Sequence, residues 1–143
     1  MTDPGIVLRK LTSLREHVGR LRRRRSGDLD SFRIDVDRQD ALSMSLLVAI
    51  QDALDIALHI ASDEGWGVPA SYGEAFTLLA DHGAIEQTLA AELAAMAALR
   101  NRLAHGYASV AAERVWNELP AGLASLDAFA AAMARHLGGI APA

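Results

Sequence analysis

Residues 38–62 read RQDALSMSLLVAIQDALDIALHIAS, a pattern that predicts one long and deeply buried α-helix. Apolar side chains recur every three or four positions, in the row Leu42, Leu46, Ala49, Ala53, Ile56 and Ile60. A second row lies beside it on a helix and consists of Leu47, Ile50, Leu54, Leu58 and Ala61. Two adjacent apolar rows are typical of a helix at the centre of a bundle.

The segment before this helix predicts a second, amphipathic helix over residues 6–25. Its apolar stripe consists of Val7, Leu11, Leu14, Val18 and Leu21. Ser26-Gly27 ends it, and the arginines of its last turn suit the negative end of the helix dipole. Residues 28–37 are expected to form an acidic loop or a short helix.

The remaining segments also predict helices. A Gly/Pro loop over residues 63–70 precedes Ser71-x-x-Glu74, a capping box that opens a helix to about Asp81. Further helices are expected over residues 85–104 and 111–137, the last with a break or kink at Pro120 and an end at Gly138-Gly139. Since no segment alternates as a strand does, we expect residues 1–143 to form a single all-α domain, a bundle of four to six helices.

Composition and charge exclude several classes of protein. The chain of 143 residues has no cysteine, which excludes a disulfide framework and a thiolate metal cage. Its net charge of -4 argues against a nucleic-acid coat protein, although the first 25 residues alone carry +6. The 51% hydrophobic content, rich in alanine, predicts a buried dimer interface. There is neither a signal-peptide pattern nor an apolar run long enough to span a membrane, so we expect a soluble, cytoplasmic protein.

One short segment, Arg100-Asn-Arg-Leu-Ala-His105-Gly-Tyr107, carries chemistry. On a helix, Arg100 and Tyr107 lie within about 40° of the apolar line through Leu89, Leu93, Met96 and Leu103. A guanidinium on such a stripe is costly unless it finds an anion or another partner. That partner is either a phosphate or, in an ion pair, Asp52, Asp55 or Glu92.

His105 lies about 140° around the helix from Arg100 and is better aligned with Asn101. One straight helix therefore does not bring Arg100 and His105 together. Either the helix unwinds before Gly106, or a second copy of the chain completes the site.

These residues resemble the Arg-x4-His-x-Tyr signature of HEPN-domain ribonucleases, and more narrowly the HepT toxins, whose partners are MntA-type nucleotidyltransferase antitoxins. The likeness covers about residues 40–120. Residues 49–60 are similar to the second main helix of that family, residues 69–76 resemble its following loop and cap, and Glu113-Arg-Val follows the motif in the same way.

The resemblance implies a HEPN-like homodimer that cleaves RNA, either tRNA or mRNA, without a metal or other cofactor. His105 is then the general acid or base and Arg100 the phosphate clamp, while Asn101 orients the histidine or a phosphate oxygen and Arg102 adds positive charge for RNA. Tyr107 is implied as the hydroxyl that the antitoxin modifies with AMP, which would block RNA binding.

Other interpretations stay open at this point. The chain is alternatively a non-catalytic helical dimer that binds a nucleotidyltransferase, a nucleotide or RNA, with His105 structural and Tyr107 in the core. The run Arg22–Arg25 is either a solvated helix end or a guide for RNA or antitoxin. The pair Asp52 and Asp55 is expected to make ion pairs or caps. The other histidines fit no metal-ligand spacing, and they are His17, His59, His82 and His136.

Overall fold

The computed structural model describes residues 4–25, 27–105 and 112–140, and every regular element in these ranges is an α-helix. The six helices are α1 (Pro4–Arg24), α2 (Leu29–Ile34), α3 (Val36–Asp63), α4 (Tyr72–Asp81), α5 (Gln87–His105) and α6 (Ala112–Ile140). The predicted all-α class and the upper end of the predicted range of helices are thus confirmed.

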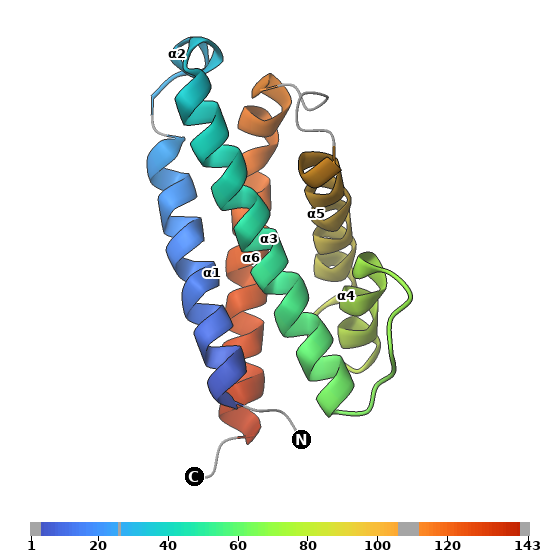
Figure 1. Cartoon of the computed structure of the whole chain (residues 1–143). Coiled ribbons are helices and arrows are strands. Elements are labelled where there is room, and N and C mark those ends of the chain that lie inside the picture. The colour runs from blue at the N-terminus through green and yellow to red at the C-terminus, as the bar shows by residue number, and fades with distance from the viewer. Residues whose placement is uncertain (1–3, 26, 106–111, 141–143) are drawn as a thin grey trace.

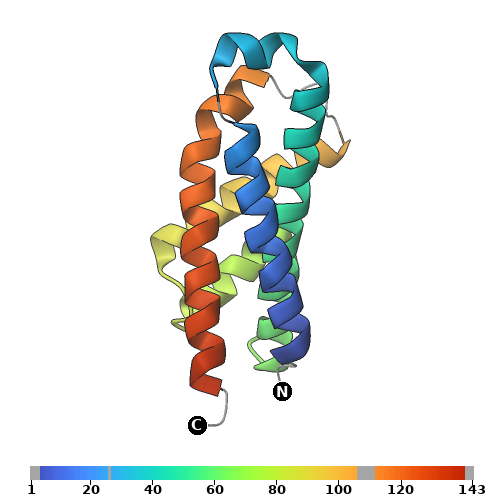
Figure 2. The same ribbon diagram turned by 90° about the vertical axis from the view of Figure 1, so that its left-hand side faces the viewer.

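Helix α3 is the centre of the bundle. It packs against α1 on one side, against α4 and α5 on the other, and also against α6. Figure 1 shows α1, α3 and α6 side by side along the length of the molecule, with α4 and α5 together on the far side of α3. Figure 2 shows that α4 and α5 cross the long helices at a steep slant, while α2 lies across one end.

The apolar rows predicted from the sequence form the core. All five residues of the α1 stripe are buried, as is the whole first row of α3. In the second row of α3, Leu47 and Leu58 are only partly buried and pack against the edge of the core. The largest wholly buried side chains include Phe32, Phe76 and Phe129, and the last two meet edge to face across 5.6 Å.

Capping residues fix the two ends of α4. The hydroxyl of Ser71 accepts a hydrogen bond from the backbone N–H of Glu74 at 3.3 Å, which confirms Ser71 as the N-cap. The Glu74 carboxylate in return accepts from the N–H of Ala70 at 2.9 Å. Gly83 has a φ of +77°, the left-handed conformation that ends a helix, just beyond the cap residue His82.

Two expectations for the last helix, a break at Pro120 and an end at Gly138-Gly139, were wrong. Helix α6 continues without a break through Pro120 and through Gly138-Gly139 to Ile140. Proline has no N–H, so the carbonyl of Trp116, four residues earlier, loses its helical donor. Arg25, directly after α1, donates from Nε to this carbonyl at 2.9 Å and takes the place of the missing N–H. Two glycines lower the helix propensity by about 1 kcal/mol each, which does not forbid a helix.

Helix α3 has the length and the apolar composition of a membrane-spanning helix, and most of its apolar segment is buried inside the bundle. The core helix of a soluble protein has the same properties, so this similarity is weak evidence for a membrane span.

Candidate active site

Arg100 lies in the penultimate turn of α5, half-buried against α3 and α4. Its Nε donates a hydrogen bond to Oε1 of Gln51 on α3 at 2.9 Å. Its Nη1 donates to Oδ1 of the neighbouring Asn101 at 3.3 Å. Its guanidinium carbon lies 5.4 Å from the centre of the Tyr72 ring at the start of α4. These contacts hold the guanidinium in one orientation, and they use two of its five N–H donors.

Gln51 is itself held in place by a chain of polar contacts. Its amide nitrogen donates to Asp55 at 2.8 Å, and the other oxygen of that carboxylate accepts from Lys10 of α1 at 3.2 Å. The arrangement joins the guanidinium of Arg100 to a carboxylate through one neutral amide. Because an amide carries no net charge, Arg100 keeps its full positive charge for an anion.

A direct ion pair for Arg100 was one of the sequence interpretations, and among the described residues it is wrong. Asp55 is reached only through Gln51, and Glu92 accepts a hydrogen bond from Ser125 at 2.7 Å instead. Asp52 accepts from Ser13 at 2.5 Å and lies 4.0 Å from Lys10. Asp52 and Asp55 of α3 therefore pair with α1, as expected of ion-pairing residues.

The buried carboxyl of Asp52 is the perturbed acid in this region. Only 5% of the residue is exposed, and this burial raises the pKa of Asp52 above its ordinary value. The hydrogen bond from Ser13 and the charge of Lys10 act in the opposite direction and are the smaller effects. Asp52 lies on the α1 side of α3, where it holds the two helices together.

Asn101, which is hydrogen-bonded to Arg100, lines a pocket of about 430 Å³. Its other lining residues come from α3, from the loop before α4 and from the start of α4, and they are Leu58, Pro69, Ala70, Ser71 and Tyr72. Tyr72 is thus shared between the pocket and Arg100. A polar side chain next to a guanidinium at the rim of an open pocket is a suitable place for a phosphate ester.

The other two residues of the motif are placed only in part. His105 is the last residue of α5, and its side chain lies outside the described structure. Tyr107 lies in the segment 106–111, also outside the described residues. Their positions relative to Arg100 therefore stay predictions from the sequence.

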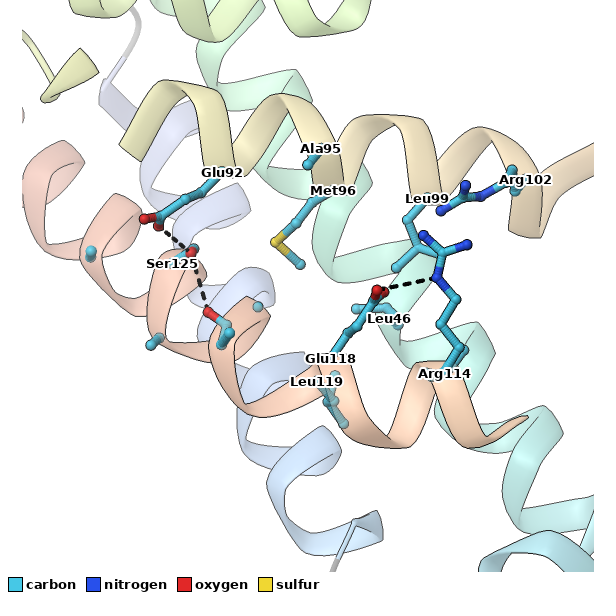
Figure 3. A pocket seen from close by; sticks show the side chains of 15 residues that line it. Leu46, Glu92, Ala95, Met96, Leu99, Arg102, Arg114, Glu118, Leu119 and Ser125 are labelled. Atoms are coloured by element: carbon cyan, nitrogen blue, oxygen red, sulfur yellow. Dashed lines mark hydrogen bonds and ion pairs between the residues drawn. The ribbon is translucent and has the colours of Figure 1, made fainter. Parts of the chain in front are cut away.

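Arg102 lies on the other side of α5, away from Arg100. It lines a pocket of about 580 Å³ between α5 and α6, together with Arg114 and Glu118 of α6. Figure 3 shows the guanidinium groups of Arg102 and Arg114 at one end of this pocket, with Met96 and Leu99 pointing into it. Arg114 donates to Glu118 at 3.1 Å. Within one chain the structure thus brings Arg100 and Asn101 together and leaves Arg102 apart.

The arginine run at the end of α1 is not simply a solvated helix end. Arg22 pairs with Asp127 of α6, and Arg24 donates to the hydroxyl of Ser45 and, at 3.2 Å, to the carbonyl of Ala41 on α3. The guanidinium of Arg25 lies 4.5 Å from the centre of the Trp116 ring, in addition to its bond to that residue's carbonyl. Three of the four arginines therefore fasten α1 to its neighbours.

Two residues of this site have no chemical signal in the sequence. Gln51 lies within the buried segment of α3, where a single amide looks like an ordinary polar interruption. Tyr72 follows the predicted cap Ser71 and is 36% exposed, so its position at the pocket depends on how α4 packs against α5. A predicted i to i+4 alignment would have shown Gln51 beside Asp55, but not which helix faces them.

Solved structures define the class of this fold. The tri-AMPylated HEPN toxin of Shewanella oneidensis in complex with MNT antitoxin superposes with a TM-score of 0.84 at 28% identity, over 94% of this chain and 99% of that one. A toxin–antitoxin complex with AMP-PNP gives 0.85 at 27% identity, over 92% and 98%. YutE, a cytosolic protein of Bacillus subtilis, shares the fold at 17% identity, with a TM-score of 0.86 over 99% and 96%. The bundle is therefore a HEPN fold.

Sequence comparison gives the family. The model described as Ribonuclease HepT-like matches residues 14–133. The mRNA nuclease HepT of Shewanella oneidensis is 32% identical over 102 residues, which are 71% of this chain and 76% of that protein. The chain belongs to the HepT-like ribonuclease family, and the resemblance found in its motif is confirmed.

Proposed function

We propose that this chain is the toxin of a two-gene toxin–antitoxin pair, a cytoplasmic, metal-independent endoribonuclease in one HEPN-like domain over residues 1–143. Its family supports the ribonuclease activity, and the similar solved toxins in complex with MntA or MNT antitoxins support the partner. The substrate is RNA, either tRNA or mRNA; the relative's name, mRNA nuclease, supports the second.

The proposal rests on the guanidinium of Arg100, which its hydrogen bond to Gln51 holds in one orientation. In RNA cleavage the 2′-oxygen attacks the adjacent phosphorus, the bond to the 5′-oxygen breaks, and negative charge develops on the phosphoryl oxygens. An arginine fixed through its Nε by Gln51 presents its outer N–H groups to those oxygens without reorganising. Preorganised donors of this kind stabilise a transition state more than mobile ones.

His105 supplies the proton transfer in this proposal. It takes the proton of the 2′-hydroxyl or gives one to the leaving 5′-oxygen, because an imidazole near its ordinary pKa does both at neutral pH. Asn101 supports the site by orienting the Arg100 guanidinium, to which its Oδ1 is bonded. Arg102 contacts the RNA backbone farther along the strand.

The catalytic site is composite, formed where two chains meet. Arg100 and His105 are about 140° apart on an ideal helix, so a site containing both draws on two copies. A surface for the second copy runs along α5 and α6, where exposed alanines line the two pockets between the helices; they are Ala95, Ala121, Ala124, Ala128 and Ala131.

Ala95→Arg together with Ala124→Arg should give a monomer in light scattering and abolish cleavage, whereas a folded, active dimer would contradict this interface.

The role of His105 is tested by measuring RNA cleavage and growth arrest after His105→Ala. Both should fall by about a hundredfold or more, since general acid–base catalysis contributes roughly 10²–10⁴-fold. His82→Ala is the matched control, because His82 stacks on Trp66 at 4.6 Å, away from the site. Undiminished cleavage by His105→Ala, or an equal loss in the control, would contradict the assignment.

Tyr107 is the residue that the antitoxin modifies in this proposal. An adenylate on its hydroxyl would place a phosphate where the RNA phosphate must bind, and so prevent binding. The toxin is co-expressed with its antitoxin and weighed by intact-protein mass spectrometry. A Tyr107→Phe chain that still gained the mass of AMP would remove this role.

A further inference from the structure

A pocket lies next to Tyr72 and Asn101, two residues that contact Arg100, and neither the motif nor the family assigns a role to it. It has a volume of about 430 Å³, within the range of small-ligand pockets of roughly 300–1,000 Å³. Its wall combines the apolar side chains of Leu58 and Pro69 with the Tyr72 ring and the Asn101 amide. Apolar and aromatic surface with one polar group at the edge is the usual environment of an unstacked nucleobase.

Tyr72 joins this pocket to the proposed phosphate clamp. Its ring lines the pocket and also receives the Arg100 guanidinium at 5.4 Å from the ring centre. A ligand in the pocket is therefore adjacent to the cation that binds phosphate. In a nucleotide the base and the phosphate are joined by a single ribose, so one nucleotide can contact an aromatic wall and an adjacent guanidinium together.

The contacts of Asn101 determine which atom it offers to a ligand. A guanidinium only donates hydrogen bonds, so the atom of Asn101 that faces Arg100 at 3.3 Å must be the amide oxygen. The amide NH₂ is then directed away from Arg100, on a residue that lines the pocket and is exposed. It can donate to a ring nitrogen or a carbonyl oxygen at the edge of a base.

The wall of the pocket is preorganised by the cap of α4. Ser71 accepts from the N–H of Glu74 at 3.3 Å, and Glu74 accepts from the N–H of Ala70 at 2.9 Å. These reciprocal bonds fix the backbone from Ala70 to Tyr72. A rigid wall lowers the entropy cost of binding, so a base gains affinity from a surface that is already in place.

We propose that this pocket, lined by Leu58, Pro69, Tyr72 and Asn101, binds the nucleobase next to the RNA phosphate held by Arg100. The base packs on Tyr72 and the apolar wall, and its edge accepts a hydrogen bond from Asn101. The inference rests on the proposed ribonuclease function for the source of the base. The pocket thereby sets which nucleotide lies beside the cleaved bond.

Binding of mononucleotides tests the pocket without any cleavage. The wild-type protein is titrated calorimetrically with AMP, GMP, CMP, UMP and, as the probe without a base, ribose 5-phosphate. At least one mononucleotide should bind about tenfold more tightly than ribose 5-phosphate, and Tyr72→Ala should lose that difference, since stacking of one base is worth roughly tenfold to hundredfold. Tyr72→Phe should keep most of it because the ring remains.

Two further variants keep the test independent of folding. Asn101→Ala, at an exposed position of α5, should weaken mononucleotide binding severalfold and change the order of preference among the bases. Val68→Ala is the matched control, because Val68 is 91% exposed in the same loop and does not line the pocket. Mononucleotides that bind no better than ribose 5-phosphate, or equally well to Tyr72→Ala, overturn the proposal.

Cleavage assays separate this proposal from the ribonuclease function. Oligoribonucleotides that differ only in a base or an abasic site next to the cleaved bond are compared by kcat/KM. Wild type should prefer the base, and Tyr72→Ala should not. Cleavage that depends on His105 but shows the same base preference in both proteins overturns the pocket and leaves the ribonuclease. Base-dependent binding without any RNA cleavage leaves a nucleotide pocket and removes the ribonuclease.

Discussion

The arginines at the end of α1 and Arg100 of α5 are used in different ways. The guanidinium groups of Arg24 and Arg25 are taken up by Ser45, by two backbone carbonyls and by the Trp116 ring. Arg100 makes one hydrogen bond to another helix, through Gln51, and one to its neighbour Asn101, which lines a pocket.

This difference shows that charge density along the sequence is a poor guide to an anion site. Four consecutive arginines indicate a cationic surface, yet at least three of them fasten α1 to α3 and α6. An isolated arginine on an apolar stripe is a stronger indication, because burying a guanidinium is costly and needs a compensating partner. The partner here is a neutral amide, which orients the cation without neutralising it.

Replacing Arg100 gives the largest effect that this comparison predicts. Arg100→Ala should lower kcat/KM for RNA cleavage by about a hundredfold or more, as loss of one preorganised donor to a transition state does. The free energy of unfolding should change little, since the guanidinium makes only two hydrogen bonds among the described residues, and one of these is to the exposed Asn101. Cleavage rates and urea denaturation measure the two effects.

Arg100→Lys is the matched variant for this prediction. A lysine keeps the charge but cannot be held through Nε, so it should recover only part of the lost activity. Full recovery would show that charge alone suffices and that the orientation by Gln51 is unimportant. An Arg100→Ala protein that cleaves RNA normally but unfolds easily would reverse the comparison and make Arg100 structural.

Arg25→Ala should give the opposite result, a loss of stability without a loss of chemistry. It leaves the Trp116 carbonyl without a donor and removes the guanidinium from the ring, at a cost of about 1–3 kcal/mol in the free energy of unfolding. The specific activity of the folded protein should stay near that of wild type.

Pro120→Ala sharpens this second prediction. Alanine at 120 restores the helical N–H for the Trp116 carbonyl, so Arg25→Ala should cost less in that background than in wild type. A double-mutant cycle by urea denaturation measures the difference. Equal losses in both backgrounds would show that Arg25 does not replace the donor that Pro120 lacks.

Residues that repeat with a helical period were predictable, and residues that depend on packing between helices were not. The stripe of α1, both rows of α3 and the cap at Ser71 depend on local spacing, and the structure confirms them. The Trp116 carbonyl that Pro120 leaves without a helical donor accepts a hydrogen bond from Arg25, 91 residues away, so a local rule that expects a break at Pro120 failed. Arg100 was predictable because its charge interrupts an apolar stripe. Its contacts with Gln51 and Tyr72 were not, because they depend on how α3, α4 and α5 pack together.

Gln51→Ala tests whether the hydrogen bond from Arg100 to Gln51 matters for cleavage. Its expected effect is smaller than that of losing Arg100 itself. Without Gln51, Arg100 keeps its charge and its place but loses its orientation, so kcat/KM should fall by roughly three- to tenfold, a loss of about 1 kcal/mol, as for one hydrogen bond. Binding of inorganic phosphate should weaken less than cleavage. Gln87→Ala is the control, since Gln87 is exposed at the start of α5, far from Arg100, and donates a hydrogen bond to Asp81 of α4. A loss as large as that of Arg100→Ala would place Gln51 in direct contact with RNA.

Asp52→Asn gives the smallest effect and tests which side of α3 is structural. Burial raises the pKa of Asp52 in the folded protein above the ordinary value of 3.8, so the unfolded chain releases this proton first as the pH rises. The contribution of Asp52 to stability is therefore complete below that value and declines as the pH rises through the raised pKa.

Asparagine does not titrate but can still accept the bond from Ser13. The unfolding free energy of Asp52→Asn relative to wild type should thus increase between about pH 3 and about pH 7, while cleavage at neutral pH is retained. A pH-independent difference would contradict the raised pKa of Asp52. A loss of cleavage would contradict its purely structural role in the contact with α1.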